Sequence, residues 1–239
     1  GQLKPLASSI PFMSTTGNHD GEFEKMAENW EALFPYDYPE PESGHYFKIQ
    51  YQNCAIVFVD LFNGIHGEEW PNVPSEDQFA WIERTFTQMG PEVKFRILVL
   101  HRSIYTTGDF GYARDLEEIF LPLVKKHNVD VVLSGHSHVF EVFHRDDINP
   151  PNGTYFIVNG GGGARPDYCV IRWFSDTPYK WDGRVNEAKG TFFANGNLAH
   201  PGRNDEVVEK FQKIGFLTHE ILHFQVKSDT LAMRAIDWN

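Results

Sequence analysis

Three short segments of the sequence carry side chains that can bind a metal ion. The first is Gly-Asn-His-Asp at 17–20, the second is His101, and the third is Gly-His-Ser-His at 135–138. Imidazole nitrogens and the carboxamide oxygen of asparagine are suitable ligands for zinc, iron or manganese. A glycine at 17 and at 135 lets the backbone turn sharply and aim the next side chain. These segments are the candidate site of this chain.

Each of the three segments follows a hydrophobic run that is typical of a buried strand. We expect strands at 12–15, 97–100 and 131–133, directly before Gly17, His101 and the 134–138 loop. In open α/β sheets, ligands bind at the carboxyl ends of the strands. The three segments are therefore expected to converge on one edge of a sheet.

The histidine pair at 136 and 138 is weak evidence when taken alone. In a regular strand this spacing would send the two rings to opposite faces, whereas in a tight loop it can serve two neighbouring metal ions. The other histidines are expected to be structural or solvated: His45, His66, His127, His144, His200, His219 and His223.

Elements of an α/β fold surround these segments. Apolar residues from Phe23 to Leu33 fall at helical spacing, and Pro35 should end that helix. Ser75 and Gln78 form a capping box that opens a second helix. We expect a third helix at about 113–127, and an irregular, Gly- and Pro-rich insertion at about 173–204. Further strands are expected at 45–50, 54–60, 139–144 and 154–158, followed by a hairpin of 215–226 with 230–236.

Composition and charge exclude several classes of protein. The formal net charge of -12 argues against a nucleic-acid partner, which needs a basic surface. No apolar run approaches the ~20 residues of a membrane span. Two cysteines, Cys54 and Cys169, exclude a disulfide framework but leave open one bridge or two buried thiols. No pattern indicates an oligomeric state.

The order of the three segments resembles the last three signature blocks of the calcineurin-like metallophosphoesterase superfamily. The strand at 155–158, the glycine loop at 160–163 and the final hairpin also resemble the C-terminal half of that family. Within it, Gly-Asn-His-Asp and the run from His101 to Tyr105 most resemble purple acid phosphatase-like members. The resemblance covers the whole chain, which we expect to form a single domain at 1–239.

The resemblance implies a four-layer α/β/β/α sandwich and a dinuclear centre of iron, zinc or manganese. Asn18, His101 and His136 would bind the second metal ion, and His138 the first. His19 would contact the substrate phosphate and protonate the leaving oxygen, with Asp20 orienting its ring. A hydroxide that bridges the metal ions would then attack a small-molecule phosphate mono- or diester. Secretion or periplasmic export is common in the family and is the localisation that the resemblance favours.

Substrate contacts are expected from the rim of this site. Arg102, Tyr105 and Arg165 are the candidates, because arginine forks and phenol hydroxyls can bind phosphate or a leaving group. Each could equally be a solvated surface residue. The loops at 63–74 and 173–204 are expected to set specificity.

Two earlier blocks of the family pattern are absent from their expected place. They are Asp-x-His and Gly-Asp-x-x-Asp or -Tyr, which supply the bridging carboxylate and the other ligands of the first metal ion. Gly108-Asp109 matches the second block by letters, but it follows His101 when it should precede Gly17. We therefore expect a domain that lacks its first strands, and a chain that is an inactive or impaired fragment of a hydrolase.

Two other interpretations are open. The chain could be a non-catalytic binding or structural module on the same fold, which would agree with the absent ligands. It could also be an unrelated zinc hydrolase that uses His136, His138 and His144, although this leaves the Gly-Asn-His-Asp segment unexplained.

Overall fold

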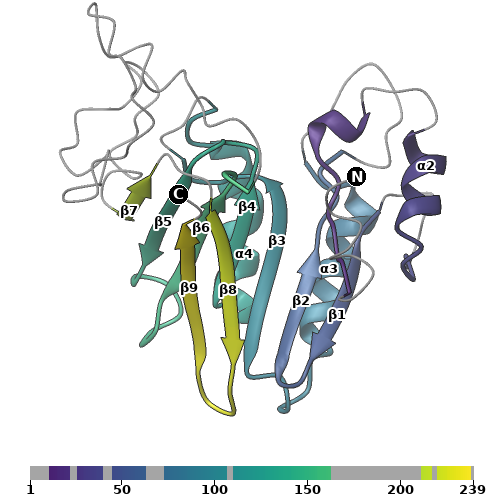
Figure 1. Cartoon of the computed structure of the whole chain (residues 1–239). Coiled ribbons are helices and arrows are strands. Elements are labelled where there is room, and N and C mark those ends of the chain that lie inside the picture. Colours follow the sequence, from purple (N-terminus) through teal and green to yellow (C-terminus); the bar gives the residue numbers. More distant parts are fainter. Residues whose placement is uncertain are drawn as a thin grey trace, which may run out of the picture.

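A mixed seven-stranded sheet in the order β1-β2-β3-β4-β6-β5-β7 forms the centre of the computed structural model, and β8 and β9 form a separate two-stranded sheet (Figure 1). The structure describes residues 11–21, 26–39, 45–62, 73–106, 110–162, 211–216 and 220–237. The strands are β1 (Phe47–Tyr51), β2 (Cys54–Phe58), β3 (Phe95–Arg102), β4 (Val131–Gly135), β5 (Phe140–Arg145), β6 (Thr154–Asn159), β7 (Gln212–Phe216), β8 (Glu220–Val226) and β9 (Leu231–Asp237). The helices are the 3-10 turn η1 (Asn18–Gly21), α2 (Met26–Leu33), α3 (Glu76–Thr87) and α4 (Arg114–His127).

The middle of the large sheet is parallel. β2, β3, β4 and β6 run in the same direction, while β1 and β5 pair antiparallel at the two sides. Parallel strands are buried on both faces, which explains their continuous apolar runs. Their carboxyl ends therefore lie at one edge of the sheet.

Two hydrophobic layers cover the two faces of this sheet. Alternate residues of β3 point in opposite directions, so Leu98 packs with α3 and α4 while Ile97 packs in the other layer. Leu222 and Phe224 of β8 pack on that second layer. Figure 1 shows α3 and α4 behind the sheet and the β8–β9 hairpin in front of it. The described residues thus form three layers of an α/β fold.

The expected helices are present, and the capping box is only half formed. The Ser75 hydroxyl accepts a hydrogen bond from the Gln78 backbone N–H at 3.2 Å. The Gln78 side chain does not return to Ser75; it binds the backbone of Asp60 instead. Pro122 lies inside α4.

Two predicted strands are wrong. Residues 11–17 form no strand, and Phe12 and Met13 are 43% and 38% exposed. The prediction failed because these two apolar residues look like part of a buried strand in the sequence. The stretch 215–226 is not one strand: β7 pairs with β5 in the large sheet, and β8 begins the hairpin.

Several other predictions concern residues outside the described part. The insertion at about 173–204, Arg165 and Cys169 all lie there. Cys54 is a buried free thiol, and burial raises its pKa to about 11. Among the helices of the described ranges, none has the length and apolar character needed to cross a membrane.

Candidate metal site

Three ligand atoms from distant parts of the chain form a small triangle. The amide oxygen of Asn18 lies 2.9 Å from Nε2 of His101 and 3.1 Å from Nδ1 of His136. The two imidazole nitrogens are 3.2 Å apart. The structure therefore brings together the three segments that the sequence indicated.

The parallel strands β3 and β4 position the two histidines. His101 is the second-last residue of β3. The last residue of β3, Arg102, pairs with Gly135 at the end of β4. His136 follows directly, with a φ of 66°, a left-handed backbone conformation that few non-glycine residues adopt. Strained backbone of this kind is often found at functional sites.

Position 17 has little room for a side chain, because the ring of His101 occupies the space next to it. A Cβ atom at position 17 would lie 2.9 Å from Cε1 of His101. The backbone then turns through η1, where the Asp20 N–H donates to the Gly17 oxygen at 3.1 Å. The Asp20 carboxylate accepts a bond from the Gly17 N–H at 2.7 Å, so it closes the turn that presents Asn18 and His19.

The two histidines of the triangle are held in the neutral form. Burial, followed by the charges of His19 and His138, lowers the pKa of His101 to about 4. Burial and then the neighbouring His101, Arg102, His138 and His19 lower the pKa of His136 to about 3. Neutral imidazoles have a free lone pair, so both rings can bind a metal ion at neutral pH.

His19 and His138 complete the electrostatic environment of the cluster. Burial is the main cause of the lowered pKa values of His101 and His136, and the charges of His19 and His138 lower both pKa values further. His19 is exposed and His138 is half-buried. Asp20 also interacts electrostatically with His19, although burial is the main influence on Asp20 and raises its pKa.

The loop that carries His136 and His138 is closed by Gly160. A Cβ atom at position 160 would lie 1.8 Å from the Ser137 carbonyl oxygen, so no other residue fits without movement of the backbone. The Gly160 N–H also donates to the Val139 oxygen at 3.1 Å. The backbone of the 160–163 loop therefore approaches the 136–138 loop closely at Gly160. Phe110 stacks on the ring of His136, with centroids 3.6 Å apart.

The predicted substrate contacts have different surroundings. Arg102 forms a two-pronged ion pair with Asp115, at 2.6 and 3.2 Å. Tyr105 is 1% exposed, and its hydroxyl donates to Glu117 and accepts from Arg145. This burial removes Tyr105 from the surface that a substrate could reach.

A cavity of about 520 Å³ reaches His101 from the face of the sheet that carries the hairpin. It lies between residues 13–15, the middle strands and β8, and its lining is mainly apolar. The lining includes Thr15, Phe58, Val99, His101, Gly135 and Phe224.

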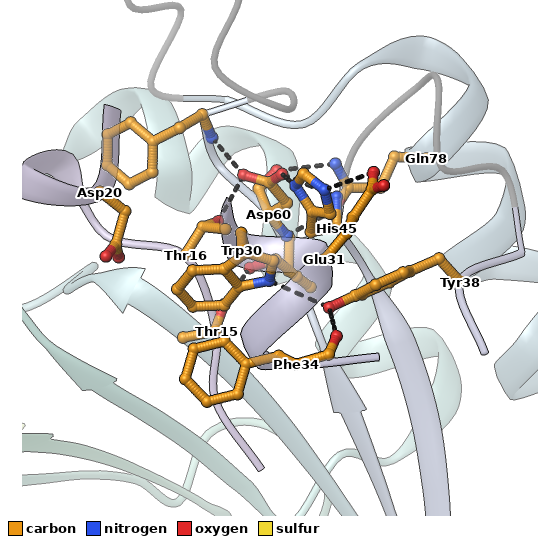
Figure 2. Close-up of polar contacts among 12 residues, drawn as sticks. Thr15, Thr16, Asp20, Trp30, Glu31, Phe34, Tyr38, His45, Asp60 and Gln78 are labelled. Atoms are coloured by element: carbon orange, nitrogen blue, oxygen red, sulfur yellow. Dashed lines mark hydrogen bonds and ion pairs between the residues drawn. The ribbon is translucent and has the colours of Figure 1, made fainter. Parts of the chain in front are cut away.

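Sequence reasoning missed Asp60, a buried residue that Figure 2 shows in the middle of a group of polar contacts with Thr16, His45 and Gln78. Asp60 follows the apolar strand β2, just as His101 ends β3, and this similarity is the signal that could have identified it. Phe110 was also missed, because a single exposed phenylalanine in a loop carries no pattern.

Within the described ranges, no group of three His, Cys, Asp or Glu side chains is placed to hold a metal ion. The triangle has two histidines, and its third member is an amide. Any metal ion here would therefore depend on Asn18.

Comparison with known proteins agrees with this fold. A family model for calcineurin-like phosphoesterase matches residues 1–140. Purple acid phosphatase 22 from Arabidopsis thaliana is 28% identical over 208 residues, which cover 82% of this chain and 45% of that protein. Probable inactive purple acid phosphatase 1 from the same plant is 24% identical over 207 residues, covering 75% of this chain and 33% of that protein.

A solved structure shows the same arrangement of elements. The purple acid phosphatase PPD1 from yellow lupin seeds matches 99% of this chain and 40% of its own chain, with a TM-score of 0.66 at 16% identity. This likeness concerns the fold alone. The chain spans less than half the length of these relatives. With more than half of its residues matched by the family model, the chain belongs to the calcineurin-like phosphoesterase family and is similar to purple acid phosphatases.

Proposed function

We propose that Asn18, His101 and His136 bind one metal ion of a dinuclear centre, in a protein that hydrolyses phosphate mono- or diesters. The triangle of ligand atoms, with sides of 2.9, 3.1 and 3.2 Å, is the observation that carries this proposal. Family membership supports phosphate esters as the substrate class.

The triangle fits a metal ion in size and in chemistry. Ligands bonded at about 2.1 Å, with angles of roughly 90–109° at the ion, lie roughly 3.0–3.4 Å apart. Two neutral imidazoles and one amide oxygen suit iron, zinc or manganese. The low pKa values of His101 and His136 keep both lone pairs available.

The other site residues would act around this ion. His138 would bind the first metal ion. His19, which is exposed at the rim, would contact the phosphate and donate a proton to the leaving oxygen. Asp20 would hold the turn from which His19 projects. When bound, a pair of metal ions supplies a hydroxide nucleophile near neutral pH and charge that stabilises the phosphate.

Arg102 is a candidate phosphate contact only if its pairing with Asp115 can open. The pair is partly exposed, so its net strength is expected to be below about 1 kcal/mol. Arg165 remains a prediction, since it lies outside the described residues.

We propose that residues 1–239 form a single domain. Its architecture would be part of a four-layer α/β/β/α sandwich, in which the β8–β9 hairpin belongs to the second sheet. His138 is the one residue that we assign to the first metal ion, and one imidazole cannot hold a catalytic metal alone. We therefore expect little or no phosphatase activity from this chain by itself. Hydrolysis is proposed for a protein that also supplies the remaining ligands.

Metal titration of this chain tests the second-metal assignment. We expect one Zn²⁺ or Mn²⁺ ion to bind per chain, measured by calorimetry at pH 7. Asn18→Ala, His101→Ala and His136→Ala should each weaken binding by 10-fold or more. His144→Ala is the matched control, since His144 bonds the Asn152 oxygen away from the triangle. Unchanged affinity in all three variants would show that the triangle is only a set of hydrogen bonds from imidazole N–H groups to an amide.

A non-catalytic module on the same fold is the second candidate, because one relative carries the name probable inactive purple acid phosphatase 1. Assays of the full-length gene product with zinc, iron or manganese, on nitrophenyl mono- and diesters, separate the two functions. A metal-dependent rate that His19→Ala abolishes supports the hydrolase. A rate equal to buffer with every metal supports the binding module.

A further inference from the structure

Asp60 is a buried carboxylate that the proposed metal site does not use. It lies after β2 with 0% exposure. Its Oδ1 accepts bonds from the Thr16 hydroxyl at 2.6 Å and from the Phe62 N–H at 2.8 Å, and its Oδ2 accepts from the His45 N–H at 2.8 Å. A buried charge needs such donors, and bonds to a charged acceptor are strong.

The backbone of Asp60 is fixed as firmly as its side chain. The Asp60 N–H donates to Oε1 of Gln78 at 2.8 Å, and Nε2 of Gln78 donates to the Asp60 carbonyl oxygen at 2.7 Å. Gln78 belongs to α3 and is itself buried. Asp60 is therefore anchored to the helical layer and has little freedom to move (Figure 2).

The segment that leads to Asn18 depends on side chains for its position, since it belongs to no strand. Its first part is held by Tyr36, whose hydroxyl donates to the Phe12 oxygen at 2.6 Å and accepts from the Ser14 N–H at 3.1 Å. The Thr15 hydroxyl donates to the Val59 oxygen at 2.7 Å. Thr16, with 0% exposure, follows with its bond to Asp60.

Thr16 is the last of these anchored residues before the turn. Asn18 lies two residues later, and its amide oxygen must stay within about 3 Å of both His101 and His136. A displacement of 1 Å at such a site is costly, because ligands must be held within roughly 0.5 Å of the working geometry. The bond between Thr16 and Asp60 is thus placed where it controls the Asn18 amide.

We propose that Asp60 is a positioning residue: through Thr16 it fixes the amide oxygen of Asn18 against the two histidines. This inference rests on the proposed metal site. If Asp60 had a purely structural role, loss of its bond to Thr16 would lower the stability of the fold and leave the Asn18 amide in place. If Asp60 positions Asn18, the same loss would also lower metal affinity.

Substitutions at Thr16 separate positioning from stability. Thr16→Val keeps the shape and removes the hydroxyl, and we expect it to weaken Zn²⁺ or Mn²⁺ binding by roughly 10-fold or more. Thr16→Ser keeps the hydroxyl and should restore affinity to within about 3-fold of the parent chain. Asp60→Ala should weaken binding at least as much as Thr16→Val does, because it also removes the acceptor of the Phe62 and His45 N–H groups. Adding Thr16→Val to Asp60→Ala should cause little further loss of affinity, because the bond between the two residues is already absent.

Thr154→Val is the matched control. Thr154 is equally buried, at the start of β6 and away from the triangle, and its hydroxyl donates to the Val129 oxygen at 2.7 Å and accepts from the Asn149 side-chain amide at 2.6 Å. Because Thr154→Val removes both bonds, it should lower Tm at least as much as Thr16→Val does and leave metal affinity unchanged. If Thr16→Val lowers Tm but leaves affinity unchanged, Asp60 has only a structural role and the inference fails.

NMR of the chain without metal makes the test independent of the proposed function. Thr16→Val should shift the side-chain amide signals of Asn18 and the ring nitrogens of His101, whereas Thr154→Val should not. A parent chain that binds no metal would overturn the proposed metal site, and the NMR comparison would still decide whether Asp60 positions Asn18. Unchanged Asn18 signals in Thr16→Val would overturn the positioning role.

Discussion

The two sides of the candidate site are held in different ways. His101 and His136 come from the ends of β3 and β4, which belong to a continuous ladder of backbone hydrogen bonds. Asn18 comes from a segment without strand structure, held by the side chains of residues such as Tyr36 and Asp60. The position of a strand is fixed by many backbone hydrogen bonds, whereas the position of the Asn18 segment depends on a few side-chain bonds, each of which one substitution can remove. The histidine side should therefore resist side-chain changes that the asparagine side does not.

The largest effect should come from breaking the histidine side through its backbone. Gly160→Ala places a Cβ 1.8 Å from the Ser137 oxygen, so the 136–138 loop must move. We expect a loss of about 3 kcal/mol in the free energy of unfolding, measured with urea, and loss of metal binding. Gly135→Ala is the control, because its Cβ would meet only the His101 oxygen at 3.9 Å. Equal stability of the two variants would contradict the close approach at Gly160.

A smaller effect should come from releasing the asparagine side. Tyr36→Phe removes the hydroxyl that bonds the backbone at Phe12 and Ser14. We expect a loss of roughly 1 kcal/mol in stability together with weaker metal binding. Tyr51→Phe, at an exposed position on β1, should change neither. Full metal affinity in Tyr36→Phe would show that the segment from 12 to 17 does not need this anchor.

The pH dependence of stability should report the burial of His101. Its pKa is about 4 in the folded chain and roughly 6.5 in the unfolded chain, so protons bind the unfolded chain first as pH falls. Stability from this group is complete above about pH 6.5 and is lost between about 6.5 and 4. His101→Asn should reduce the loss between pH 6 and pH 5 by about 1 kcal/mol in urea titrations. An unchanged pH slope in that variant would show that His101 is not buried as described; His144→Asn serves as control.

The smallest effect is expected at Arg102 and Asp115, where both partners are partly exposed. Asp115→Asn should change the free energy of unfolding by less than about 0.5 kcal/mol. It should also leave metal affinity unchanged, since the pair lies beside the triangle and contributes no ligand. A loss above about 2 kcal/mol would mean that this pair supports the end of β3.

The regular part of this fold could be predicted from the sequence because its signals are local. Buried strands such as β3 and β4 are continuous apolar runs, and α3 begins at a recognisable cap. Since parallel strands end at one edge, the meeting of His101 and His136 followed from these runs. The Asn18 segment was expected at the same edge through a strand at 12–15 that does not form, and the family resemblance then assigned Asn18 to the same metal ion.

The parts that escaped prediction depend on contacts between distant residues. Thr16 and Asp60 are 44 residues apart, and no local pattern marks their bond. The same holds for Gln78, whose side chain was expected to return to Ser75 and binds Asp60 instead. Phe12 and Met13 misled because hydrophobic letters do not reveal whether a partner covers them.

The clamp of Gln78 on Asp60 limits how this protein can change length. The Gln78 side-chain amide joins the N-terminal turn of α3 to Asp60, which holds the Asn18 segment, so the position of Gln78 relative to Asp60 must be kept. Adding or deleting one residue between Ser75 and Gln78 would rotate the amide by about 100° around the helix axis and separate the two. Insertions beyond Gln88, where α3 has ended, leave that geometry intact. Length variation among natural versions of this domain should therefore accumulate after the helix and avoid its first turn.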